Sequence, residues 1–196
     1  MFISTAASHW EIVIWRDVAG THVTLRGPET RAAVMPIPLD AEFVGIQFRL
    51  GAFLPDLALP ALVDRDLSIA SATSGSLYLG GREWEIPGYD DVEALVGRLA
   101  GAGVLAADPI VGTAMQGGAM GLSPRSVERR VLRATGLSLG AIKQIERAHR
   151  ATALLDTRVG IADVVAEVGY ADQAHLTRSL KRFMGQTPGR MVAEAR

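Results

Sequence analysis

The chain has 196 residues, of which 48% are hydrophobic and 21% charged, with no cysteine and a formal net charge of −1. This length and composition suit one mid-sized globular domain or two small ones. The absence of cysteine excludes disulfides, thiolate metal sites and thiol nucleophiles, and it suits a reducing cytoplasm, which is the expected location. We expect neither a secretion signal in residues 1–10 nor a membrane anchor, since no apolar run reaches the roughly 20 residues that span a bilayer.

Charge is unevenly divided along the chain. Residues 1–121 carry 7 Lys+Arg and 14 Asp+Glu, whereas residues 122–196 carry 13 Lys+Arg and 7 Asp+Glu. Such asymmetry hints at a nucleic-acid-binding part joined to a different part. Two solvated surfaces of opposite sign would give the same counts, so charge alone leaves both readings open.

The first half of the chain predicts a β-rich domain over residues 1–88. Runs rich in β-branched and aromatic residues alternate with turn residues there, and the strand candidates are residues 10–16, 21–26, 43–50 and 77–79. The turn at residues 17–20 predicts a hairpin between the first two runs. Residues 57–67 are compatible with a short helix.

From Asp90 onwards the hydrophobic spacing becomes helical, which predicts an α+β protein overall. Residues 89–107 form a connecting helical segment, with helical spacing that continues past Gly101 to Leu105. Residues 108–196 read as short helices with caps and glycine stops, and the predicted caps are Asp108, Ser123, Ser138 and Asp172. Short helices joined by tight turns with glycine are typical of helix-turn-helix units.

The helix predicted over residues 173–184 has two different faces. At about 100° per residue, Leu176, Leu180 and Phe183 fall on one side and form the buried stripe. The remaining surface carries mainly hydrogen-bonding and cationic side chains: Gln173, Ala174, His175, Thr177, Arg178, Lys181 and Arg182. Gln and Arg can read base edges while Lys and Arg neutralise phosphates, so this face suits a helix in the DNA major groove.

The helix predicted over residues 124–134 repeats this arrangement. Val127, Val131 and Ala134 face inward, while Arg125 and Arg129 point directly away, with Glu128 and Arg133 on the shoulders. A single amphipathic helix with a basic outer face is usually just a soluble helix. Two such helices, each preceded by a short helix and a turn with glycine, favour DNA binding over that reading.

The motifs in this half resemble a known family. Residues 160–170 (GIADVVAEVGY) and 176–188 (LTRSLKRFMGQTP) resemble the second helix-turn-helix of the AraC/XylS family of transcription regulators, and residues 122–130 (LSPRSVERR) and 135–138 (TGLS) are similar to its first recognition helix and the end of that helix. The resemblance covers residues 108–191. It departs from the family where a glycine-rich loop follows residues 110–116, which leaves open how firmly the first unit is held.

The resemblance implies two recognition helices in successive major-groove segments, about 34 Å apart. It implies a DNA-binding set of Arg125, Ser126, Glu128, Arg129, Arg133, Gln173, Ala174, His175, Arg178, Lys181 and Arg182. Lys181 and Arg182 are assigned to phosphates. Double-stranded DNA is then the partner, and RNA polymerase, a second copy of the chain and a small-molecule effector are further partners that the resemblance allows.

The N-terminal region, about residues 1–105, shows a weak similarity to the truncated cupin-type sensor region of some family members. Such regions bind a small molecule or mediate dimerisation, and the sequence does not choose between them. One alternative is therefore a small-molecule-binding or enzymatic β domain whose helical part serves only for dimerisation.

Catalytic, metal and cofactor sites are not expected. Only His9 and His22 lie in the β region, too few ligands for a cupin-type metal site. The carboxylate pairs Asp64/Asp66 and Glu83/Glu85 are read as solvated loop residues. His149 lies on the apolar stripe of the linking helix, where we expect a hydrogen-bonded structural role, and the tryptophans Trp10, Trp15 and Trp84 are expected in the core or an interface.

Overall fold

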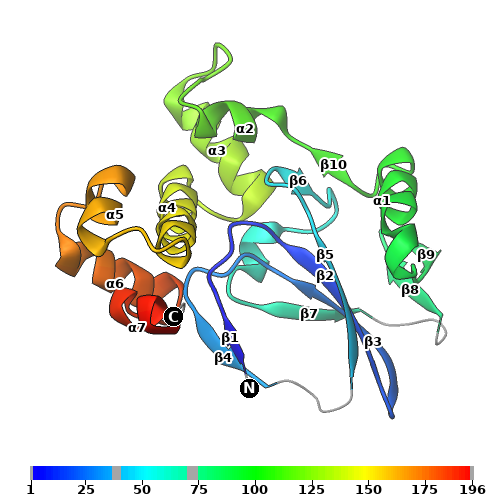
Figure 1. Ribbon diagram of the computed structural model, residues 1–196. Helices are drawn as coiled ribbons and strands as arrows, with labels where there is room; N and C mark the ends of the chain where they lie inside the picture. The colour runs from blue at the N-terminus through cyan, green and yellow to red at the C-terminus, as the bar shows by residue number, and fades with distance from the viewer. Residues whose placement is uncertain (1, 37–40, 70–74, 195–196) are drawn as a thin grey trace. The chain divides into compact units, whose positions relative to one another are not determined.

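The strands of the computed structural model gather in the first half of the chain and the longer helices in the second, which confirms the α+β class and the β-rich N-terminal region (Figure 1). The structure describes residues 2–36, 41–69 and 75–194. Contacts divide the chain into two units. The sheet unit comprises His9–Pro28 and Pro38–Leu139, and the helical unit comprises Met1–Ser8, Glu29–Ile37 and Gly140–Arg196.

These units differ in composition from the predicted segments. The first two helices of the predicted DNA-binding segment belong to the sheet unit, and Met1–Ser8 belong to the helical unit. The domain boundaries predicted at residues 88 and 107 were placed where the sequence pattern changes, and they stay predictions. The similarity of the N-terminal region to cupin-type domains also stays a prediction.

The main sheet has four antiparallel strands in the order β5 (Glu42–Gln47), β2 (Glu11–Asp17), β3 (Gly20–Arg26) and β7 (Asp66–Ile69). β2 and β3 form the predicted hairpin, with Asp17 opposite Gly20. The Asp17 carboxylate accepts hydrogen bonds from the backbone N–H groups of Ala19 and Gly20, at 2.8 and 3.1 Å, and so closes the turn. Inward residues alternate along both strands, as a half-buried sheet requires.

Three small antiparallel pairs complete the strands of the described residues: β1 (Phe2–Ser4) with β4 (Ala33–Met35), β6 (Ala52–Phe53) with β10 (Ala106–Ala107), and β8 (Ser76–Leu79) with β9 (Arg82–Glu85). The strand predicted at residues 77–79 is therefore confirmed. The helix considered for residues 57–67 is only a 3-10 turn, η1 (Leu59–Leu62), because the chain then enters β7 and pairs with β3.

A hydrophobic core lies in the sheet unit. Trp10 is 2% exposed, stacks on Phe48 with 3.9 Å between ring centroids, and donates from Nε1 to the Ala52 carbonyl at 2.7 Å. Trp15 and Trp84 are half-buried, and Trp15 stacks on His22 at 3.8 Å. The expected core role is thus confirmed for Trp10.

Helix α1 (Val92–Gly101) follows the short 3-10 turn η2 (Tyr89–Asp91) and contributes Leu95 and Leu99 to this core. The prediction that this helix continues to Leu105 is wrong, because α1 ends at Gly101. Gly103 adopts a φ of +74°, which turns the chain out of the helix and into β10.

Six helices follow, namely α2 (Pro109–Met115), α3 (Pro124–Thr135), α4 (Leu139–Asp156), α5 (Ile161–Val168), α6 (Gln173–Phe183) and α7 (Pro188–Glu194). The side chains of Asp108, Ser123 and Asp172 accept hydrogen bonds from the first-turn N–H groups of α2, α3 and α6, which confirms these caps. Within the described residues, no helix combines the length and apolar character needed to cross a bilayer.

Candidate nucleic-acid interface

Helix α6 buries one face and exposes the opposite one. Leu176, Leu180 and Phe183 are buried, as the sequence spacing predicts. Arg178, Lys181 and Arg182 are all exposed, and no acidic residue lies on the helix. A surface helix with this composition carries a row of cations on its solvent side, where a phosphate backbone can approach it.

The first turn of α6 carries the hydrogen-bonding residues of the predicted set. Gln173 and Ala174 are exposed, whereas His175 is half-buried. The His175 ring meets the edge of Tyr170 at 5.1 Å between centroids, and its Nδ1 accepts a hydrogen bond from the Ala171 N–H at 3.5 Å. Because Nδ1 accepts this hydrogen bond, Nε2 is the ring nitrogen left to contact a base edge or a phosphate.

The turn that precedes α6 is fixed by contacts that the helical spacing alone does not reveal. Tyr170 is buried, and its hydroxyl lies 2.9 Å from Ser179 Oγ on α6. The Arg147 guanidinium of α4 stacks over the Tyr170 ring at 4.8 Å and donates to the Gly169 carbonyl at 3.5 Å. Arg147 is therefore a positioning residue for α6 that sequence reasoning missed.

Backbone N–H groups from the N-terminal part of the chain hydrogen-bond to the C-terminal end of α6. The Phe183 carbonyl accepts a hydrogen bond from the Ala6 N–H at 2.7 Å, and the Arg182 carbonyl accepts one from the Ala32 N–H at 2.8 Å. His149 Nε2 of α4 lies 2.7 Å from the Ala6 carbonyl, which confirms the predicted hydrogen-bonded role of this histidine. The last carbonyls of α6 are thus satisfied by Ala6 and Ala32, from the N-terminal part of the chain.

Helix α3 presents the first half of the predicted set. Arg125, Glu128, Arg129 and Arg133 are exposed, opposite buried Val127, Val131 and Ala134. Ser126 is half-buried, with its hydroxyl 3.0 Å from the hydroxyl of the cap Ser123. The structure therefore places most of both predicted residue sets on solvent-facing helix surfaces, with Ser126 and His175 half-buried. Their individual roles in base reading or phosphate contact stay predictions.

Helices α2 and α3 are tied together by an ion pair. Arg130 Nε and Nη2 lie 2.8 and 2.6 Å from the two oxygens of the Asp108 carboxylate. Burial alone would raise the pKa of Asp108, but the hydrogen bonds from Arg130 and the Ile110 N–H, with the charges of Arg130 and Arg133, hold this pKa below its ordinary value. Ile110, Val111 and Ala114 of α2 are also buried, so α2 and α3 are firmly packed despite the glycine-rich loop between them.

A groove runs along the exposed side of α3 within the sheet unit, and we call it the α3 groove. Its cavity volume is about 510 Å³, and it is lined by Phe53, Leu54, Pro55, Asp56, Leu57, Ala58, Pro60, Arg129, Leu132 and Arg133. The Arg133 guanidinium lies over the Phe53 ring at 5.7 Å. Arg133, predicted to contact DNA, therefore also contacts the β-rich part of its own unit.

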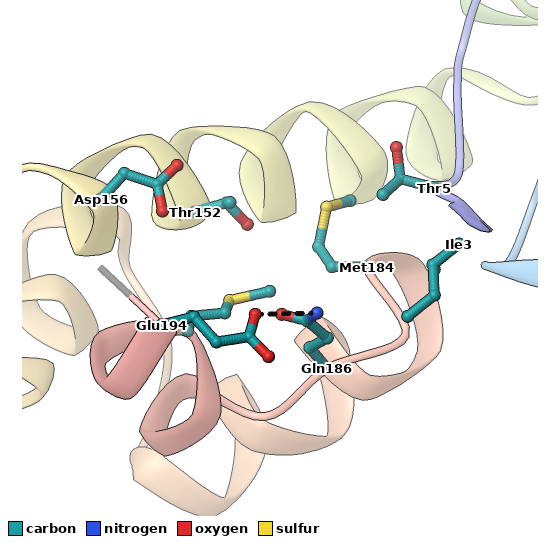
Figure 2. A pocket seen from close by; sticks show the side chains of 8 residues that line it. Ile3, Thr5, Thr152, Asp156, Met184, Gln186 and Glu194 are labelled. Atoms are coloured by element: carbon teal, nitrogen blue, oxygen red, sulfur yellow. Dashed lines mark hydrogen bonds between the residues drawn. The ribbon is translucent and has the colours of Figure 1, made fainter. Parts of the chain in front are cut away.

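A second hollow lies in the helical unit, away from the exposed row of α6. Figure 2 shows Thr152 and Asp156 of α4 on one side and Gln186 and Glu194 on the other, with Gln186 Nε2 donating to Glu194 at 3.3 Å. None of the predicted DNA-binding residues lines this hollow. Two of its side chains are carboxylates, which repel phosphate, so we do not count it as part of the nucleic-acid interface.

The remaining polar clusters do not form an ion site in the described residues. Across residues 2–36, 41–69 and 75–194, no group of three or more His, Asp or Glu side chains is arranged to hold a metal ion. Asp64, Asp66, Glu83 and Glu85 are all exposed, in keeping with the predicted solvation. Their placement in loops is wrong for three of them, because Asp66 lies in β7, 3.5 Å from the Arg26 guanidinium, and Glu83 and Glu85 lie in β9.

Comparison with known proteins adds one result. Residues 117–194, which contain α3 to α7, match the family model of a helix-turn-helix domain. No curated protein and no solved structure matches the chain. The matched range contains both predicted recognition helices and every motif that resembles the AraC/XylS family. The chain therefore carries, over residues 117–194, a helix-turn-helix DNA-binding domain of the AraC type.

Proposed function

We propose that the protein is a sequence-specific transcription regulator that acts by binding DNA and catalyses no reaction. Helices α3 and α6 enter successive major-groove segments on one face of the duplex. The N-terminal β-rich region modulates this binding. The observation that carries the proposal is the exposed cationic row of α6, Arg178, Lys181 and Arg182, opposite the buried Leu176, Leu180 and Phe183.

Affinity and specificity come from different residues of the two helices. Lys181 and Arg182 contact phosphates and release counterions, which gives sequence-independent affinity that falls with salt. Gln173 and Arg178 are both exposed on α6 and read base edges, as bidentate side chains do. Arg125 and Arg129 read bases from α3 in the same way.

Modulation by the N-terminal region is supported by the composition of the two units. Helices α2 and α3 belong to the same unit as the main sheet. Helix α3 contacts a β-strand directly, because the Arg133 guanidinium lies over the Phe53 ring. N-terminal residues such as Ala6 hydrogen-bond to the last turn of α6. Each recognition helix thus has a direct contact with the N-terminal region through which a change there can alter DNA binding.

The test is selection of genomic fragments by the full chain, followed by titration of a selected and a scrambled duplex at fixed salt. We expect a selected duplex to bind more tightly than the scrambled one by a factor of about 10³ or more. The double variant Arg125→Ala/Arg178→Ala should lose most of this ratio, whereas Arg98→Ala, an exposed arginine of α1, should keep it. Absence of any selective complex would favour the rival, in which the helical part serves only for dimerisation.

A further inference from the structure

We propose that a cavity in the sheet unit binds an uncharged apolar small molecule with one hydrogen-bond donor, and that residues 53–62 transmit its binding to α3. We call residues 53–62 the bridging segment. The inference rests on the proposed function, because it names the ligand class and the route of the modulation. It concerns a different surface from the DNA-binding faces.

The cavity has a volume of about 310 Å³, at the small end of ligand pockets, so its occupant is a single ring or a short chain. Most of its wall is aliphatic, formed by Leu25, Leu54, Leu57, Ile69, Leu79 and Val104. Leu67 and Tyr78 also line it, and they are 42% and 52% exposed. Two large apolar side chains left partly uncovered at the mouth of an apolar cavity favour an apolar occupant.

The polar groups of the wall decide the rest of the ligand chemistry. Among the described residues that line the cavity, Asp56 and Ser68 carry the only carboxylate and aliphatic hydroxyl groups, and none is Lys, Arg or His. The Tyr78 hydroxyl already donates to the Gly81 carbonyl at 3.0 Å. A ligand donor can therefore pair with the Asp56 carboxylate, while an anionic ligand would meet a negative charge and no cation.

The bridging segment lies between this cavity and α3. Leu54, Asp56 and Leu57 line both the cavity and the α3 groove, whose other wall is formed by Arg129, Leu132 and Arg133. A side chain shared by two cavities cannot move to accommodate an occupant in one without changing the shape of the other.

Close contacts fix the bridging segment to both helices of the first helix-turn-helix. Phe53 pairs with Ala106 in the β6–β10 ladder, just before the Asp108 cap of α2. At the end of α3, a Cβ atom on Gly136 would lie 2.9 Å from the Leu59 carbonyl oxygen, so α3 and η1 are in contact through their backbones. A ligand that fixes Leu54 and Leu57 therefore also fixes α3, which lowers the ordering cost of DNA binding.

The experiment measures ligand binding and DNA binding on the full chain with phenol, indole and cyclohexanol as probes and benzoate as the charged counterpart. We expect at least one neutral probe to bind, by calorimetry and by methyl chemical shifts of the cavity residues, and benzoate not to bind. The bound probe should tighten binding to the selected duplex by about fivefold or more, the lower end of allosteric coupling.

Three variants locate the effect. Leu67→Trp fills the mouth of the cavity and should abolish probe binding, while Val18→Trp, at a fully exposed turn position of the same unit, should not. Phe53→Ala removes the ring under Arg133 and should keep probe binding but reduce the effect on DNA. No binding by any neutral probe, binding that survives Leu67→Trp, or bound probe with unchanged DNA affinity would each overturn the proposal.

These outcomes separate the inference from the proposed function. Selective DNA binding without a response to any probe would refute the inference alone. If the full chain without probe bound no duplex selectively, the proposed function would be refuted. Probe binding to the cavity would still be measured separately, by calorimetry.

Discussion

Asp108, the N-cap of α2, pairs with Arg130 of α3. The carboxylate caps α2 by accepting from the Ile110 N–H at 3.0 Å, and it accepts two further hydrogen bonds from the Arg130 guanidinium of α3. One side chain thus fixes the start of the first helix and its distance from the second. The pair therefore fixes the position of α3 relative to α2, although neither residue belongs to the predicted DNA-binding set.

The first prediction concerns stability. Asp108→Ala removes the cap and the ion pair, and we expect it to lower the free energy of unfolding by at least about 1 kcal/mol. Asp108→Asn keeps a capping oxygen and should cost less. The matched control is Asp91→Ala, because Asp91 stands at the N-cap of α1 but makes no side-chain capping hydrogen bond. Urea denaturation measures all three, and equal losses at Asp91 and Asp108 would contradict the prediction.

The second prediction is the pH dependence of the same pair. Because the pKa of Asp108 is lowered in the folded state, the folded state favours the ionised carboxylate. Its stabilising contribution is therefore present above the ordinary aspartate pKa of about 3.9 and is lost as the pH falls through the lowered folded-state value. Denaturation midpoints between neutral and acidic pH should fall less steeply for Asp108→Asn than for the parent protein. Parallel curves would show that the pair does not contribute.

Local features of this fold were predictable from sequence. The caps Asp108, Ser123 and Asp172 depend on a side chain and a backbone N–H within three residues, so the information lies in one short segment. The buried stripe of α6 follows from helical spacing in the same way. Helical spacing therefore also identified the exposed residues of α3 and α6.

Contacts between distant segments were not predictable. Nothing in the spacing of residues 108–130 distinguishes Arg130, which pairs with Asp108, from Arg129, which faces solvent. Neither Phe53 nor Ala6 carries a local signal for its contact with α3 or α6, because each contact depends on how separate elements pack. The sequence also missed the end of α1 at Gly101. Val104 has helical spacing, but it is buried in the core of the sheet unit outside the helix.

The third prediction uses three glycines with the same backbone conformation. Gly136, Gly169 and Gly185 have φ values of +76°, +76° and +74°. Alanine at Gly169 would have no atom within 4 Å of its Cβ, so it should cost only the left-handed strain of about 1–2 kcal/mol. The other two add a steric conflict, with the Leu59 carbonyl oxygen at 2.9 Å from position 136 and Ile3 Cγ2 at 2.9 Å from position 185.

We therefore expect Gly136→Ala and Gly185→Ala to lower the free energy of unfolding by about 1 kcal/mol or more beyond Gly169→Ala. Chemical denaturation of the three variants gives the comparison directly. If the three losses were equal, the close approach of Leu59 to α3, and that of Ile3 to the end of α6, would both be contradicted.

The fourth prediction separates base reading from phosphate contact on α6. Arg178→Ala should lower affinity for the selected duplex by about 1–3 kcal/mol and change affinity for a scrambled duplex much less. Lys181→Ala should weaken both complexes alike and reduce the slope of log affinity against log salt by about 1. Both residues are exposed on the same helix, so a general loss of folding cannot mimic the difference between them.

The distinction depends on measuring both duplexes at several salt concentrations, because counterion release dominates affinity at any single one. Arg178→Lys is the informative companion, since it keeps the charge but replaces the rigid guanidinium fork with a flexible ammonium. Equal losses of affinity for the selected and the scrambled duplex in Arg178→Ala would instead assign Arg178 to a phosphate contact. The base-reading face of α6 would then shift towards its first turn, where Gln173 and His175 lie.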